Sequence, residues 1–222
     1  MPAPDRPTLD RLDLSRLGIA EPWERWEAVT LHGVHTGFLH RVLEDGVLTT
    51  RMAFEPHPAQ RRAAAELPER FLAQSTLEFG VAGEPWTAAT YEDSITEQRV
   101  RIDRERAGLG PHAVPSWAEL PLIAQTAGQE LAFERLEEAS PLQGGLRVLP
   151  AVLRPTDAGG SGRTRVELVS EGHVLAVHVV HDGEVVASDW GGGTASEPVA
   201  GREQALAGLS AVLTAFADRP RG

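Results

Sequence analysis

Short apolar runs separated by Gly and Pro make up most of the chain, and this pattern predicts strands joined by tight turns. Two turns are marked by the pairs Asp45-Gly46 and Asp182-Gly183, because glycine tolerates the positive φ of a type I′ hairpin turn. We predict one hairpin from residues 38–44 and 47–54, and a second from residues 173–180 and 184–190. Further strands are predicted over residues 77–81, 87–91, 99–103, 148–153 and 164–169.

Three stretches carry apolar residues at helical spacing. The first, residues 59–75, is rich in Ala but contains Pro68, which should kink or split a helix. The second follows Ser116 and Glu119, which have the spacing of a capping box, and continues to residue 136. The third is predicted to begin after Ser196 as its N-cap. Its inward face would carry Leu206, Leu209, Val212 or Leu213, and Phe216.

These elements predict an α+β fold: an antiparallel sheet built from hairpins with about three helices, because the helices do not alternate singly with strands. We expect a single domain over residues 1–222, with residues 1–8 frayed and residues 155–163 forming a flexible loop. The strand that contains Pro150 should lie at an edge, because proline cannot donate to the ladder. A pseudo-repeat of hairpin-helix units, over residues 30–75 and 164–217, is an alternative to two independent hairpins.

The charge of the chain argues against nucleic acid as a partner. The formal net charge is −11 and every basic residue is Arg, scattered along the sequence rather than clustered. An exposed acidic face would instead suit a protein partner with a basic surface. The Arg-only, Ala/Gly/Pro-rich composition also suggests a high-GC bacterial genome.

Two residue types are absent, and each absence excludes a class of chemistry. The sequence has no Cys and no Lys, which removes disulfides, thiol nucleophiles, cysteine metal sites, Schiff bases and the lysine of a P-loop. No signal-peptide core and no apolar run long enough for a membrane span is present, so we expect a cytoplasmic protein without membrane contact.

The histidines are the one concentrated signal for chemistry. They occur in LHGVHTGFLH (residues 31–40) and in EGHVLAVHVVHDG (residues 171–183). If the two strands meet in one sheet, His32, His40 and His178 are the candidates for a metal site, because neutral imidazole binds zinc, iron, nickel and copper. The alternative is a set of surface or hydrogen-bonded core histidines, since positions i and i+3 on a strand point to opposite faces.

Other motifs are weaker. Gly191-Gly192-Gly193 could place backbone amides around an anion, but a structural linker is the favoured interpretation because Glu197 already supplies a negative charge there. Ser161 lacks the surroundings of a hydrolase nucleophile. A group of carboxylates could divide acid and base roles or form an exposed acidic face: Glu78, Glu84, Glu92, Asp93, Glu97 and Asp103.

Two functions follow as hypotheses. The first is a non-catalytic protein-binding or adaptor protein, chaperone-like or immunity-type, that presents an acidic face and an open sheet edge. The alternative is a small enzyme of bacterial specialised metabolism, with an apolar pocket and His or Glu as acid and base, metal-dependent if the histidines assemble. Exposure of Trp23, Trp26 and Trp190 together would favour a homodimer.

Overall fold

The computed structural model describes residues 22–63, 67–80, 85–110, 112–123, 126, 128–157 and 162–220. Thirteen strands in this part of the chain form one largely antiparallel open sheet with the order β6-β5-β4-β3-β2-β1-β13-β12-β11-β10-β9-β8-β7. Only the β7–β8 pair is parallel. The two halves of the chain therefore build the two halves of the sheet, and β1 and β13 join them in the middle.

The strands in chain order are β1 (Trp23–Leu31), β2 (Val34–Glu44), β3 (Val47–Phe54), β4 (Phe71–Phe79), β5 (Trp86–Asp93), β6 (Arg99–Asp103), β7 (Ala113–Pro115), β8 (Leu131–Glu137), β9 (Arg147–Asp157), β10 (Arg163–Ser170), β11 (His173–His181), β12 (Glu184–Asp189) and β13 (Thr194–Val199). The helices are short. They are α1 (Pro58–Ala63), η3 (Ser116–Ala118), α2 (Leu120–Ile123), η5 (Ser140–Gln143), α3 (Arg202–Leu206) and α4 (Ala211–Ala217).

Four hairpins turn at a residue followed by glycine, with positive φ at both positions: His32-Gly33, Asp45-Gly46, Glu171-Gly172 and Asp182-Gly183. This geometry is that of a type I′ turn, whose twist matches the twist of the flanking strands. The two predicted Asp-Gly hairpins are confirmed, β2 with β3 and β11 with β12.

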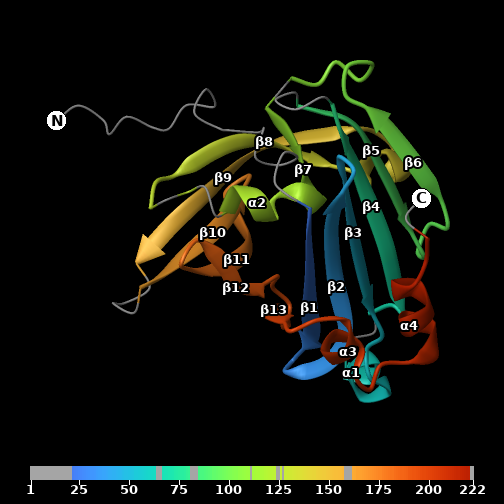
Figure 1. The fold of residues 1–222 in the computed structure, drawn as a ribbon. Helices are drawn as coiled ribbons and strands as arrows, with labels where there is room; N and C mark the ends of the chain where they lie inside the picture. The colour runs from blue at the N-terminus through green and yellow to red at the C-terminus, as the bar shows by residue number, and fades with distance from the viewer. Residues whose placement is uncertain are drawn as a thin grey trace.

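The sheet bends so that its two ends pack against each other on the inner face. Trp86 on β5 is buried in one core cluster with Ala113 on β7 and Leu136 on β8, and its indole nitrogen donates to the Ala113 carbonyl at 2.6 Å. Figure 1 shows α2 between the strands of the two halves. Leu120 and Pro121 of α2 line a cleft together with Trp23 of β1 and Val185 of β12, so the two halves face each other across this space.

The outer face of β1–β3 is covered by α3 and α4, where Trp26, Phe38, Leu213 and Phe216 form a separate apolar cluster. The buried guanidinium of Arg51 on β3 attaches α4 to this face. Its nitrogens donate to the carbonyls of Ala217 at 3.2 Å and Arg219 at 2.6 Å. A cation at these carbonyls satisfies acceptors that a helix C-terminus leaves free.

Two predicted helices are largely wrong. Residues 59–75 contain only the short α1, and Phe71 onward is strand β4. Residues 116–136 contain η3 and α2, and residues 131–136 are strand β8. In β4 five consecutive residues are buried, so the strand lacks the alternation that identifies a half-exposed strand. β8 has an exposed position at Glu134, and it forms a strand because it pairs with β7 and β9.

The third helix begins later than predicted. Ser196 is a buried residue of β13 instead of an N-cap, and the cap of α4 is Ser210, which accepts from the Leu213 amide. Leu206, Leu213 and Phe216 are buried as expected, but Val212 is exposed.

The fold class is confirmed in its coarser part, an antiparallel sheet of hairpins, but the protein is mostly β with a few short helices. β9, which contains Pro150, lies between β8 and β10 rather than at an edge. In the described residues β13 follows the β11–β12 hairpin before any helix, so the pseudo-repeat is not shown. Residues 155–157 belong to β9, whereas residues 158–161 and 1–8 lie outside the described residues.

Candidate functional site

A buried polar network occupies the inner face where the two halves of the sheet meet. Arg25 on β1 and Arg41 on β2 are cross-strand partners, and the same oxygen of Glu27, Oε1, accepts from both guanidinium groups, at 2.8 Å from Arg25 Nε. The other oxygen accepts from the hydroxyl of Ser196 at 2.6 Å. Glu27 is 1% exposed, so one buried carboxylate serves two cations.

These contacts decide the protonation state of Glu27. Burial raises its pKa, but the charges of Arg41 and Arg25 and the hydrogen bond from Ser196 outweigh burial, and the pKa lies below its usual value. Glu27 is therefore an anion at neutral pH.

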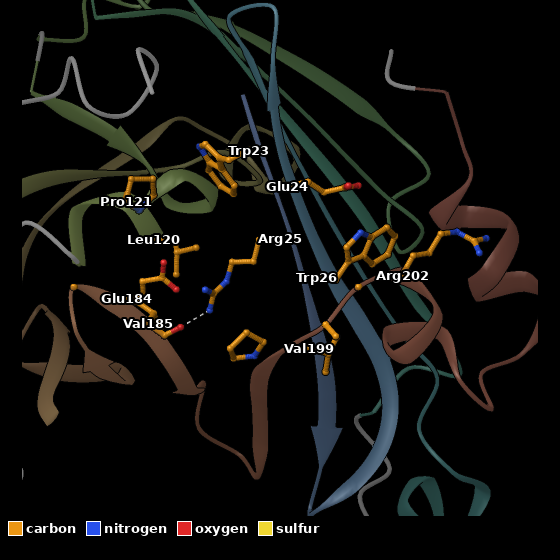
Figure 2. Close-up of a pocket in the computed structure, with 14 residues that line it drawn as sticks. Trp23, Glu24, Arg25, Trp26, Leu120, Pro121, Glu184, Val185, Val199 and Arg202 are labelled. Atoms are coloured by element: carbon orange, nitrogen blue, oxygen red, sulfur yellow. Dashed lines mark hydrogen bonds between the residues drawn. The ribbon is translucent and has the colours of Figure 1, made fainter. Parts of the chain in front are cut away.

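Arg25 also connects the halves directly. Its Nη2 donates to the carbonyl of Val185 on β12 at 2.5 Å, beside a cleft of about 840 Å³ lined by β1, α2 and the start of β12. Figure 2 shows this bond, with Trp23 and Leu120 toward one side of β1 and Trp26 with Arg202 toward the other. The cleft exists because β12 pairs with β13 only at Ser188 and Asp189, so the two strands diverge beyond these residues.

A smaller cavity, of about 280 Å³, lies deeper between the halves. It combines apolar and aromatic side chains with three charged ones. Its walls are Leu39, Arg41, Thr50, Met52, Ser116, Trp117, Glu119, Arg135, Leu168, Leu175, Ala176 and Trp190. An apolar lining with a few polar groups is the usual composition of a small-molecule site.

The charged groups distinguish the two hollows. In the larger cleft, Glu24 bonds His40, Arg202 bonds Asp218 and Arg25 bonds Glu27. In the smaller cavity, Arg41 is 5% exposed and its Nε has no hydrogen-bond partner among the described residues. A buried charged donor without a partner is costly and is a mark of functional sites. We therefore take the smaller cavity, called the inner cavity below, as the candidate site.

Glu119 and Arg135 form the second charged pair of the inner cavity, with Nε of Arg135 donating to Glu119 Oε1 at 2.6 Å. Burial raises the pKa of Glu119 to about 7; the charge of Arg135 opposes this shift, and Glu138 and Glu137 add to it. A carboxyl group that titrates near neutrality inside a cavity is suited to proton exchange.

The wall that carries Trp117 is held by Glu138, a buried carboxyl group outside the cavity lining. Glu138 accepts from the hydroxyls of Ser116 at 2.5 Å and Ser75 at 3.2 Å, and from the Trp117 amide at 3.3 Å. Burial raises its pKa despite these bonds. The contacts connect η3 with β4, so they fix the position of the Trp117 side of the cavity.

The opposite wall is held by His178 and Trp190. His178 Nδ1 lies 2.9 Å from Ser188 Oγ, and the edge of the ring contacts Trp190 at a centroid distance of 5.3 Å. Burial, with a contribution from the charge of Arg41, lowers the pKa of His178 to about 4. His178 is thus neutral at physiological pH. The indole nitrogen of Trp190 donates to Ser196 Oγ at 3.1 Å, which links this wall to Glu27.

The three histidines predicted as metal ligands lie in different environments. His32 is in the β1–β2 turn, its amide bonded to the Gly193 carbonyl; His40 stacks on Trp26 at 3.8 Å on the helix-covered face; His178 is on the inner face. No group of three or more His, Asp or Glu side chains that could hold a metal ion occurs among the described residues. The structure therefore does not bring the predicted ligands together.

The other predicted sites are at most partly assembled. Gly191–Gly193 form the turn before strand β13 rather than a helix start. In the carboxylate group, Glu92, Asp93 and Glu97 line one pocket, where Glu92 pairs with Arg219. Glu78 pairs with Arg101 elsewhere, while Glu84 and Ser161 lie outside the described residues. Of the three tryptophans named for a homodimer, Trp26 is buried on the outer face, so the three do not form one exposed patch.

The residues that do form the inner cavity were not predicted from the sequence as a site. Glu119 was interpreted as part of a capping box, and neither Arg41 nor Arg135 was singled out. The one available signal was an Arg within an otherwise apolar strand, as in HRVL (residues 40–43), since charged residues are almost never buried unless paired.

No protein-family model, curated protein or solved structure matches the chain. Within the described ranges, no helix has the length and apolar character required to cross a membrane.

Proposed function

We propose that this protein binds a small, mostly apolar molecule in the inner cavity, without chemical conversion of the ligand. The observation that carries the proposal is the buried Arg41, whose Nε has no hydrogen-bond partner among the described residues, in the wall of a cavity that is also lined by Trp117, Trp190, Leu39 and Met52. Apolar surface supplies affinity, and a few polar groups fix orientation.

The size of the cavity limits the ligand. A volume of about 280 Å³ corresponds to roughly nine water molecules at about 30 Å³ each. The ligand would therefore have about ten non-hydrogen atoms.

Binding is better supported than catalysis because the hydroxyls in the wall have other hydrogen-bond acceptors. Thr50 donates to the Trp117 carbonyl at 3.4 Å, and Ser116 donates to Glu138. The His178–Ser188 pair lies behind the wall, and a pKa of about 4 makes His178 a weak base at neutral pH.

The test uses the tryptophans in the wall as reporters. Addition of octanoate, phenylacetate and their amides should change tryptophan fluorescence and raise the melting temperature, since a ligand that binds only the folded state stabilises it. Ala176→Phe, which fills the cavity, should remove the response, whereas Val174→Phe on the exposed part of the same strand should retain it. No response of the wild type to any of the four compounds would contradict the proposal.

Two other functions have one supporting observation each. An enzyme is favoured by Glu119, whose pKa of about 7 suits a general acid or base. A protein-binding adaptor is favoured by β6, which ends the sheet and could add a strand of a partner. Conversion of a bound compound that Glu119→Gln abolishes would support the enzyme, and capture of a partner that Val100→Pro on β6 abolishes would support the adaptor.

A further inference from the structure

Two cations on the inner face share one carboxylate. Arg25 and Arg41 both donate to Glu27 Oε1, and the Ser196 hydroxyl donates to Oε2. A single carboxylate balances one guanidinium, and like charges opposite each other on two strands repel. Glu27 alone therefore does not balance both cations.

Of these two cations, Arg41 lines the inner cavity, while Arg25 is directed to Val185 at the cleft. Burial lowers the pKa of the Arg41 guanidinium, whereas the negative charges of Glu27 and Glu119 raise it. Arginine remains protonated in proteins, so Arg41 is a buried cation whose Nε has no hydrogen-bond partner among the described residues.

Among the described residues of the cavity wall, Glu119 is the one carboxyl group, and its negative charge acts on Arg41. Its hydrogen bond, however, comes from Nε of Arg135, whose Nη1 also donates to Glu137. His178, which also lies near Arg41, is neutral because burial lowers its pKa to about 4. No acceptor among the described residues bonds Arg41 Nε, so an acceptor on a ligand would complete the hydrogen bonds of this cation.

We propose that the ligand of the inner cavity is a monocarboxylate with an apolar body, and that Arg41 binds its carboxylate. This inference rests on the proposed function. A carboxylate supplies both a hydrogen-bond acceptor and a negative charge to Arg41. The carboxylate accepts from Arg41, and the apolar body lies against Leu39, Leu168 and the two tryptophans. Guanidinium and carboxylate are complementary in geometry as well as in charge.

Calorimetric titration of wild-type protein with four probes tests the inference. Phenylacetate and octanoate carry the charge, while phenylacetamide and octanamide have nearly the same size and shape without it. We expect the carboxylates to bind about 10- to 100-fold more tightly than their amides, as hydrogen bonds to charged groups require. Arg41→Gln should remove this preference while retaining binding of the amides. Arg154→Gln, an exposed arginine paired with Glu167, is the control and should keep the preference.

The outcomes separate the inference from the function on which it rests. If the acids and the amides bind equally, or if the amides bind more tightly, the inference of a carboxylate ligand is overturned. The inner cavity would then still be a ligand site. Failure of all four probes to bind overturns the proposed function together with the inference. If Arg41→Gln does not fold, the comparison of acids with amides on the wild type still decides the outcome.

Discussion

Arg25 on β1 reaches the backbone of Val185 on β12, 160 residues away in the chain, and donates to its carbonyl at 2.5 Å. No backbone ladder joins the two strands at this point, because β12 pairs with β13 only at Ser188 and Asp189, and Val185 precedes these residues. A side chain thus connects the two halves of the sheet where their backbones diverge.

Arg25→Met should lower the free energy of unfolding by about 1–3 kcal/mol, because it removes charge-assisted hydrogen bonds to Val185 and Glu27. Urea denaturation measures the change, with an unaltered dependence on urea concentration if the folded state is otherwise the same. Arg154→Gln, whose ion pair with Glu167 is exposed, should change stability by less than about 1 kcal/mol. Equal decreases in the free energy of unfolding of the two variants would show that Arg25 stabilises the fold no more than an exposed ion pair does.

Glu27→Gln should be more damaging, at about 3–5 kcal/mol, because it leaves two buried guanidinium groups without a counter-charge. Adding Arg41→Met to this variant should recover part of the loss, since one of the two cations is then gone. The double-mutant cycle measures the coupling. Strictly additive losses would show that Arg41 and Glu27 do not depend on each other.

Glu119 should make stability depend on pH between about 4 and 7. Its folded pKa of about 7 exceeds the unfolded value of about 4.3, so the folded state retains a proton that the unfolded chain releases. The contribution of Glu119 to the free energy of unfolding is therefore fully present below about pH 4. It falls as the pH rises and is lost above about pH 7. Glu119→Gln removes this dependence.

Thermal or urea unfolding at pH 4.5 and 7.5 provides the measurement. Over this range the wild type should lose up to about 3 kcal/mol relative to Glu119→Gln. Glu134→Gln, at an exposed position of β8, is the control and should follow the wild type. A constant difference between wild type and Glu119→Gln at both pH values would place the folded pKa near its ordinary range.

Gly193→Ala should destabilise the protein through a contact with His32. Gly193 has φ +79°, and a Cβ there would overlap the His32 imidazole. The positive φ alone should cost about 1–2 kcal/mol, and the overlap adds to it. In a His32→Ala background only the backbone cost should remain, which calorimetry can measure. The same loss in both backgrounds would show that the imidazole moves aside freely.

The hairpins could be predicted from the sequence because a type I′ turn is a local structure. Asp45-Gly46 and Asp182-Gly183 specify their turns without reference to the rest of the chain. The helices predicted over residues 59–75 and 116–136 failed because Phe71–Phe79 and Leu131–Glu137 pair with strands on both sides. Tertiary pairing overrides local propensity, and the consecutive buried residues of Phe71–Phe79 show no alternation.

The inner cavity could not be predicted from the sequence either, and the reason is related. Arg41, Glu119, Arg135 and Trp190 come from four separate parts of the chain, and they meet only because the sheet bends until β7 packs on β5. The bend depends on contacts such as that of Trp86 with Ala113. Neither spacing nor composition encodes a contact between such distant elements.

The junction of β1 with β13 has a consequence for the order of events during synthesis. Each half of the sheet consists mainly of neighbouring hairpins, which close quickly, but Trp26 pairs with Val199, and closing so long a loop carries a large entropic cost. A ribosome would release β1 long before β13. During that interval one edge of β1 is an unpaired strand at the centre of the future sheet, and such edges recruit other chains. Aggregation of nascent chains should therefore be most frequent before residue 199 emerges.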